Sequence, residues 1–165
     1  MAEVAAEAGV SRQAVYLHFG SRSGLLVSLV RAMDDEAGIR NRLESALGEE
    51  DPIKAFRRFV REWLRFAIAI QPIASTLYAA RMEDEAAEAA WEDRARDLRA
   101  GFRAAISRLG EAGYLRDGLS LPSAANLVWA FCSLPVVEQL LLDLEWSSDR
   151  IVREVPEAAL EAVTS

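Results

Sequence analysis

Apolar residues recur every three or four positions along nearly the whole chain, a spacing that predicts an all-α protein. The longest apolar stripe begins at Asp51-Pro52, an N-cap aspartate followed by proline at the first helical position. We expect Pro72 to end that helix and to open another from Ile73 to about Met82. A second long helix is predicted from Asp84 to Ala112, with Gly113 as its C-terminal stop.

The C-terminal third is the most apolar part of the chain. Ser120 is a predicted N-cap for a helix over Leu121–Leu142, which Pro135 should kink. Ser147 or Ser148 should cap a last helix with a further interruption at Pro156. No strand alternation, internal repeat or low-complexity linker is present, which supports the all-α interpretation.

Ala5 to Leu26 has the spacing of a helix-turn-helix, whose second helix enters the DNA major groove. Gly9 stands where the first helix must stop, and Ser11 is a natural N-cap for the second. Val15 and Phe19, four residues apart, give the second helix an apolar face. Its outer side then carries Arg12, Gln13, Tyr16 and His18.

These residues resemble the DNA-binding signature of TetR-type (tetracycline-repressor-like) regulators. The matching positions are Gly9-Val10-Ser11, Val15-Tyr16, Phe19, Ser21-Arg22 and Leu25-Leu26. The resemblance implies a helix-turn-helix head with its connecting helix over residues 1–37 and a helical ligand-binding and dimerisation domain over 38–165. In the family a further helix precedes the motif, and Met1 stands where that helix should already have ended.

The outer residues of the motif suit different parts of DNA. Arg12 pairs naturally with guanine and Gln13 with adenine, and Ala14 could contact a thymine methyl group. Tyr16 and His18 are better suited to phosphates, as is Arg22 where a helix begins after Ser21. The predicted DNA-binding residues are Ser11, Arg12, Gln13, Ala14, Tyr16, His18, Ser21 and Arg22, and the family's contacts fall on the same positions.

Aromatic residues are frequent in the predicted body helices. Ordinary core packing explains most of them, but the resemblance implies that the body encloses a pocket for a small hydrophobic effector. The candidate lining residues are Phe59, Trp63, Phe66, Tyr78, Trp91, Phe102 and Trp129. No particular effector follows, because apolar pockets lack a sequence code.

The segment Leu121–Leu142 is apolar around most of its circumference, so one face should need a partner. In the family the last two helices pair with their twofold mates, and a reader of palindromic DNA needs such a dimer. We therefore expect a homodimer interface made by Val128, Phe131, Val136, Val137, Leu140, Leu141, Ile151, Val155 and Leu160.

Charge and composition narrow the function classes. The net charge is −7, yet residues 1–33 carry three arginines against two glutamates, a balance of +1. A DNA-reading head on an acidic body fits that asymmetry. The single cysteine, Cys132, fits a reducing compartment. No signal peptide or membrane-length apolar run is expected, which favours a cytoplasmic protein without a membrane partner.

Catalytic chemistry has little support. His18 is the only histidine, no cysteine–histidine metal cluster can form, and no phosphate-binding loop or nucleophile motif is present. We expect no enzyme activity, no metal and no cofactor. The sequence favours a ligand-responsive regulator, more readily a repressor than an activator, that binds a palindromic operator and releases double-stranded DNA when its effector binds.

Two alternatives stay open. A helical dimeric small-molecule-binding protein without DNA binding would follow if the absent leading helix reflects a real loss, and a late start or a shortened chain would leave the regulator function intact. A small helical enzyme is the weaker alternative. With the chain as given, we expect a loosely packed head in which Val4, Val15 and Phe19 lack cover.

Overall fold

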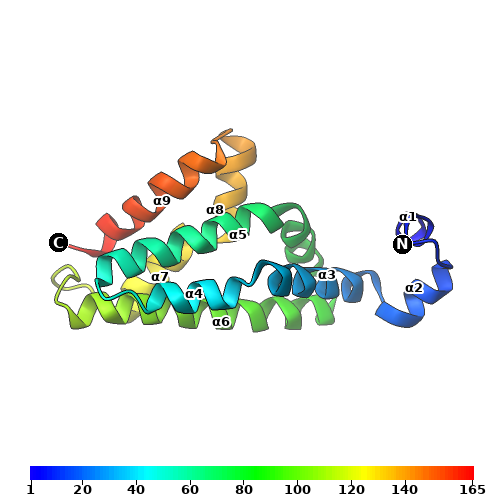
Figure 1. The fold of residues 1–165 in the computed structure, drawn as a ribbon, viewed down its shortest axis with the longest axis horizontal. Helices are drawn as coiled ribbons and strands as arrows, with labels where there is room; N and C mark the ends of the chain where they lie inside the picture. Colours follow the sequence, from blue (N-terminus) through cyan, green and yellow to red (C-terminus); the bar gives the residue numbers. More distant parts are fainter.

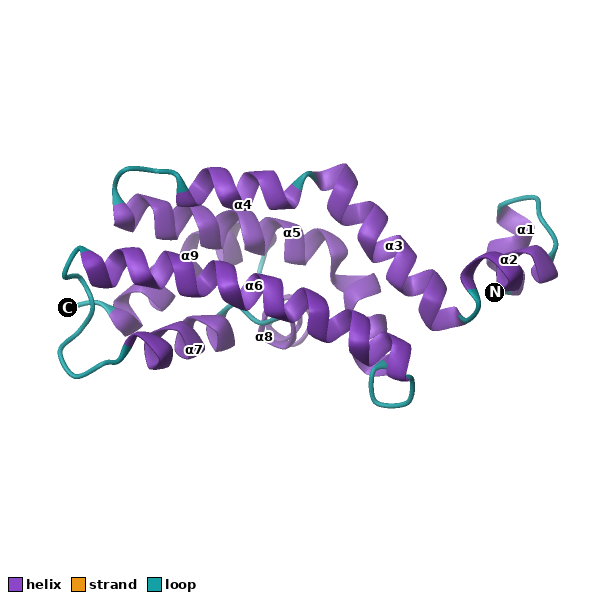
Figure 2. Cartoon of the chain, turned by 90° about the horizontal axis from the view of Figure 1, so that it is seen from below, coloured by secondary structure: helices purple, strands orange, loops and turns teal.

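The structure, a computed structural model, describes all 165 residues and is built from helices and loops (Figures 1 and 2). The only bridge between extended residues pairs Leu115 with Thr164. The all-α prediction is therefore confirmed. In chain order the elements are α1 (Ala2–Glu7), α2 (Arg12–Phe19), α3 (Arg22–Ala37), α4 (Ile39–Leu47), α5 (Pro52–Ala80), α6 (Glu85–Glu111), α7 (Leu121–Phe131), α8 (Leu134–Glu138), a π-helical turn η1 (Gln139–Asp143) and α9 (Ser148–Val163).

Two parts of unequal size are joined by α3 (Figure 1). The short helices α1 and α2 form a small head at one end of the molecule, and α4 to α9 form the body. Helix α3 contacts α2 near its start and packs on α5 and α6 along its length. A movement of α3 relative to the body therefore displaces the head.

Helix α5 is the centre of the body. It packs on α3, α4, α6, α8 and α9, and with α9 it contributes the most residues to the main core. The stripe of apolar residues in α5 faces a matching stripe in α6, so that Phe56, Phe59 and Leu64 are buried together with Phe102 and Ile106. Burying each of these side chains contributes roughly 1.5–3 kcal/mol.

Helix starts lie where local capping chemistry places them. Asp51 Oδ1 accepts hydrogen bonds from the backbone N–H groups of Ile53 at 2.8 Å and Lys54 at 3.1 Å. Asp84 caps α6 in the same way through Ala86 and Ala87. Ser147, rather than Ser148, caps α9. These bonds satisfy N–H groups that a helix start leaves without partners.

The expectation that Pro72 ends a helix is wrong, because α5 continues through it to Ala80. Proline removes one N–H donor from the helix, but apolar residues at helical spacing stay buried on both sides of it. Ile70 precedes Pro72, and Ala74 and Leu77 follow it on the same face. The last turns of α5 bend away from the line of the first ones (Figures 1 and 2). Pro156 likewise lies inside an uninterrupted α9.

The predicted helix over Leu121–Leu142 is divided, and the division precedes Pro135. Helix α7 ends at Phe131, the chain turns at Cys132-Ser133, and Pro135 lies in the first turn of α8. Proline is well accepted there, because first-turn N–H groups have no partner within the helix.

The region Leu121–Asp143, 23 residues with a mean hydropathy of 1.5, is nevertheless long and apolar enough to span a membrane by length and composition alone. The sequence expectation that no such run exists was wrong, although the break at Cys132-Ser133 divides it.

Candidate DNA-binding head and ligand cavity

The turn between α1 and α2 is closed by two residues with distinct roles. Gly9 has a φ of +65°, a left-handed conformation that side-chain-bearing residues rarely adopt. Ser11 Oγ accepts a hydrogen bond from the backbone N–H of Ala14 at 3.0 Å, which fixes the start of α2. Ala5 and Val15 are buried where α1 and α2 pack together.

The turn between α2 and α3 brings the backbone of Gly24 close to the backbone of Phe19. Ser21 Oγ accepts from the backbone N–H of Gly24 at 3.0 Å and caps α3. A Cβ atom on Gly24 would collide with the backbone carbonyl oxygen of Phe19. Only glycine fits here, so the angle between α2 and α3 depends on this residue.

The residues predicted to contact DNA lie together on the head. Ser11, Arg12, Gln13, Ala14, Tyr16, His18 and Arg22 are exposed, and Ser21 is half-buried. The Arg12 guanidinium carbon lies 5.5 Å from the centre of the Tyr16 ring, and the rings of His18 and Phe19 meet edge to face at 4.5 Å. Arg12, Gln13 and Ala14 form the first turn of α2.

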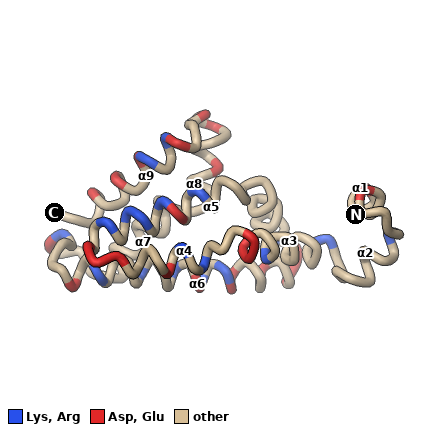
Figure 3. Tube along the Cα trace, in the orientation of Figure 1, with Lys and Arg blue, Asp and Glu red and all other residues tan.

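The expectation of an uncovered apolar face on the head is partly wrong. Val15 is buried and Phe19 is half-buried, whereas Val4 is exposed as expected. Charged residues are sparse on the head and of both signs along the body helices (Figure 3). Binding to DNA through this head would therefore rest on a few specific groups rather than on a dense basic patch.

Helix α3 is held on the body by apolar packing and by a polar contact. Val30 is buried in a small cluster with Leu77 of α5 and Ala87 of α6. Near the head, the buried Ser23 hydroxyl donates a hydrogen bond that, together with the N–H of Ala87, lowers the pKa of Asp84 below its ordinary value of 3.8. The α5–α6 corner thus contacts the first turn of α3.

A large cavity of about 970 Å³ lies in the body next to α3. Its wall is formed by parts of α3, α4, α5, α6, α7 and α8, and 20 of its 34 lining residues are hydrophobic. Six of the seven predicted aromatic residues line it, namely Phe59, Trp63, Phe66, Tyr78, Trp91 and Trp129. The volume lies in the range of small-molecule sites.

Phe102 does not line the cavity, so its assignment as a ligand contact is corrected. It is fully buried behind the wall, where its ring meets that of Phe59 edge to face at 5.2 Å and that of Trp129 at 6.1 Å. Phe102 therefore supports two lining rings from behind. Its helical spacing on α6 predicts that Phe102 faces the inside of the body, but not whether the ring lines the cavity or packs in the core behind it.

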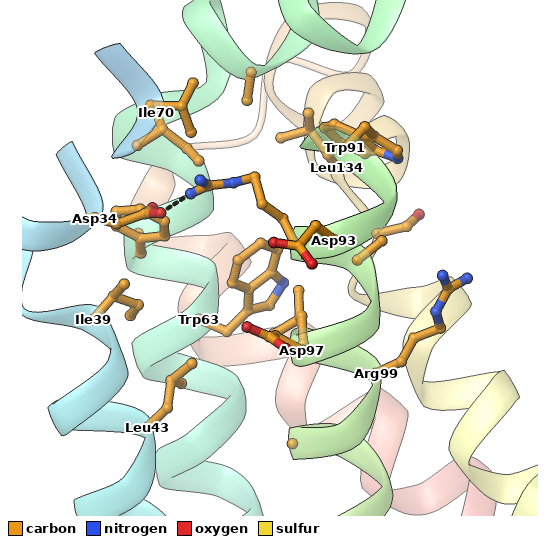
Figure 4. A pocket seen from close by; sticks show the side chains of 18 of the residues that line it. Asp34, Ile39, Leu43, Trp63, Ile70, Trp91, Asp93, Asp97, Arg99 and Leu134 are labelled. Atoms are coloured by element: carbon orange, nitrogen blue, oxygen red, sulfur yellow. Dashed lines mark hydrogen bonds and ion pairs between the residues drawn. The ribbon is translucent and has the colours of Figure 1, made fainter. Parts of the chain in front are cut away.

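One polar bond crosses this wall between helices far apart in sequence. Arg94 of α6 donates a hydrogen bond to Asp34 Oδ2 of α3, and both residues line the cavity (Figure 4). The pKa of Asp34 is raised above 3.8, because burial penalises the charged carboxylate more than Arg94 compensates it. This pair was not predicted from the sequence. The only sequence feature that points to it is that Asp34 lies on the same helical face as the apolar residues Val27 and Val30. A carboxylate on the apolar face of a helix is expected to find a partner.

The predicted dimer residues require correction. Val128, Val137, Ile151, Val155 and Leu160 are buried in the chain's own core and are not available to a partner. The candidates that keep some exposure are Phe131, Val136, Leu140 and Leu141. Further exposed apolar residues of this region, which were not among the predicted interface residues, are Leu127, Leu142 and Leu144.

Groups with other chemistry are few. No cluster of three or more histidine, cysteine, aspartate or glutamate side chains could hold a metal ion. Cys132 is fully buried, and burial raises the pKa of its thiol far above the ordinary value. A thiol kept neutral in this way is a poor nucleophile.

The head is similar to a known family of regulators. Residues 1–29 match the family model described as "Bacterial regulatory proteins, tetR family". No curated protein sequence matches the chain. The family match covers the helix-turn-helix that the sequence analysis had singled out, and it is a match to regulators rather than to enzymes.

Solved structures extend the likeness to the whole chain. PfmR, a TetR-family transcriptional regulator from Thermus thermophilus, superposes with a TM-score of 0.75 at 22% identity, over 97% of this chain and 86% of that one. A Rhodococcus sp. protein assigned to the TetR-family transcriptional regulators gives 0.68 at 20% identity, over 99% and 86%. The ketosteroid transcriptional regulator KstR2 of Mycobacterium tuberculosis gives 0.66 at 16%, over 99% and 84%. Residues 1–29 therefore match the tetR-family model, and the chain has the fold of TetR-family transcriptional regulators over nearly its whole length.

Proposed function

We propose that this protein is a DNA-binding transcriptional regulator, acting as a homodimer on a palindromic operator and released from it by a small hydrophobic effector. The observation that carries the proposal is the course of α3. This helix begins beside the exposed residues of α2 and ends in the wall of the cavity, with Asp34 and Asp35 among the lining residues.

The head has the chemistry for both kinds of DNA contact. Arg12 and Gln13 lie in the first turn of α2, where long side chains with paired hydrogen-bonding groups read guanine and adenine edges. Tyr16, His18 and Arg22 are suited to phosphates, which position the head without reading sequence. Ser11 and Ser21 hold the two helix starts at which backbone N–H groups can also face an anion.

A dimer would bring two such heads to successive major grooves. We place the interface on the exposed apolar surface of α7, α8 and η1, with Phe131 and Leu142 at its centre and Val136, Leu140 and Leu141 beside them. Two weakly charged heads acting together bind far more tightly than one, because the second contact is intramolecular.

Effector release would be a population shift. A ligand that binds better when α3 is displaced favours a head separation that no longer fits the operator, and DNA reciprocally weakens ligand binding. We infer repression, because a protein of this size can block access to the DNA it covers. The competing function is a dimeric small-molecule-binding protein that does not bind DNA.

The test is a selection of duplexes from random DNA by the purified chain, followed by titration of the enriched duplex. The proposal expects a palindromic consensus and an affinity for it at least about a hundredfold above that for a scrambled duplex. This threshold lies below the roughly thousandfold or greater ratio that is typical of specific recognition. Enrichment of no sequence, with retained binding of apolar molecules in the body, would favour the competing function.

A further inference from the structure

One oxygen in the cavity wall lacks a partner. Asp34 Oδ2 accepts the hydrogen bond from Arg94, but Asp34 Oδ1 is buried and accepts none (Figure 4). A buried carboxylate oxygen without a donor is costly, and such groups are rare in folded proteins. A hydrogen-bond donor on a ligand in the cavity would therefore find an acceptor at Asp34 Oδ1.

The charges around Asp34 indicate what kind of donor fits. Five arginines and six acidic residues line the cavity, so the wall has no excess of positive charge to hold an anion. Two of the other arginines have acidic partners in the wall: Arg40 lies 3.6 Å from Asp97, and Arg99 lies 2.9 Å from Glu92. A carboxylate ligand would have to displace an existing acid from these arginines, whereas a cation would not. Arg31, the lining arginine without an acidic partner, is exposed to solvent, where an ion pair contributes little.

Arg81 also lines the cavity, and its Nε–H is a buried donor that makes no hydrogen bond. Its guanidinium is already engaged by other groups, however. A terminal nitrogen lies 3.8 Å from Glu88, and the guanidinium carbon lies 4.0 Å from the centre of the Tyr78 ring. The positive charge of Arg81 is therefore compensated within the chain, as the charge of Asp34 is by Arg94. The preference for a cation accordingly rests on the acidic excess of the wall and on its aromatic rings.

The aromatic lining also favours a cation, since the faces of tryptophan and tyrosine rings attract positive charge. Arg81 lies over Tyr78 in this way, and the Arg99 guanidinium lies 5.4 Å from the Trp129 ring. Trp63 and Trp91 also line the cavity, and no arginine lies over either ring. In Figure 4, Asp34 and Trp91 lie on opposite sides of the view, with Trp63 between them.

We propose that the effector is an apolar molecule bearing a protonated amine, whose N–H group donates to Asp34 Oδ1 while its apolar part lies against Trp63 and Trp91. This inference rests on the cavity being the effector site. It goes further by naming the ligand's chemical class and the atom that recognises it. Because Asp34 belongs to α3, the amine contacts the helix that carries the head.

The test uses three probes with the same ten-carbon chain and different ends: decylamine, 1-decanol and decanoate. Their binding to the DNA-free chain is measured at neutral pH and below the concentration of micelle formation, by calorimetry and by tryptophan fluorescence. We expect decylamine to bind most tightly and at least about tenfold more tightly than decanoate, the difference expected for one charge-assisted hydrogen bond.

Two variants assign that preference to a residue. Asp34→Asn keeps the shape and an acceptor oxygen but removes the charge, so it should lose most of the preference for decylamine and retain decanol binding. Glu36→Gln removes one negative charge from an exposed position of the same helix outside the cavity wall and should retain the preference.

The result separates this inference from the proposed function. Decanoate as the tightest probe, an unchanged preference in Asp34→Asn, or no binding of any probe would overturn the amine assignment even if the chain selects an operator. A preference lost only in Asp34→Asn would support the assignment even if the chain selects none.

Discussion

The Trp63 indole N–H of α5 donates a hydrogen bond to the backbone carbonyl of Cys132 at 2.8 Å. Cys132 is the C-cap residue directly after α7, and the bond satisfies a carbonyl at this helix end next to the main core. The same indole ring lines the cavity. One side chain therefore holds the break between α7 and α8 and forms part of the ligand site.

Replacing Trp63 tests this dual role. Trp63→Phe should lower the free energy of unfolding by about 1–3 kcal/mol, the cost of leaving a buried carbonyl unpaired together with lost packing. Urea unfolding measures it. Trp91→Phe is the matched control, because Trp91 also lines the cavity and its indole makes no hydrogen bond within the chain. Equal losses in the two variants would contradict a specific role for the Trp63 bond.

The raised pKa of Asp34 predicts a pH dependence of stability. Folding raises this pKa above 3.8, so the stabilisation associated with Asp34 is fully present below that value and is lost as pH rises through the folded pKa. The free energy of unfolding of the wild type relative to Asp34→Asn should therefore fall between acid pH and neutrality. Urea unfolding at several pH values measures the difference. A relative stability that rises with pH would contradict burial as the dominant influence on Asp34.

The exposed apolar surface predicts a dimer that one charge disrupts. Phe131 is 41% exposed on α7, and Phe131→Glu should give a monomer in light scattering at micromolar concentration, because a carboxylate in an apolar interface lacks a partner. Leu17→Glu is the control, since Leu17 is 88% exposed but belongs to the head. A dimer that persists in Phe131→Glu would place the interface elsewhere.

Local chemistry explains which parts of the fold the sequence predicts well. Capping by Ser11, Ser21 and Asp51 depends on residues two or three positions away, and each predicted start is a helix start in the structure. Local chemistry fails to predict the structure at Pro72, where the helix continues. A helix continues through proline when its two halves bury a common face, and that burial is decided by α6 and α8 rather than by neighbours in sequence.

The errors at the sites have the same origin. Val137 and Phe131 lie in one strongly apolar segment, yet the first is buried in the core and the second is exposed. A helix apolar on all sides does not indicate which face its own chain covers. Asp34 and Arg94 are 60 residues apart, and no local spacing joins them. The aromatic lining was predicted from the family resemblance and not from spacing, and Phe102 shows that a ring at the same helical spacing can lie in the core instead.

Base reading by α2 is the central claim, and one comparison tests it most directly. Fluorescence anisotropy measures the affinity of wild type, Arg12→Ala and Arg22→Ala for the selected operator and for operators changed at single base pairs, at two salt concentrations. Arg12→Ala should lose roughly tenfold or more of the discrimination at one base pair in each half-site, the effect of about 1–3 kcal/mol for a bidentate base contact. Arg22→Ala should weaken binding to all duplexes alike and make the salt dependence shallower by about one unit of slope per head. If Arg12→Ala also lowers the affinity for every duplex equally and leaves all discrimination intact, α2 does not read the bases and the account is contradicted.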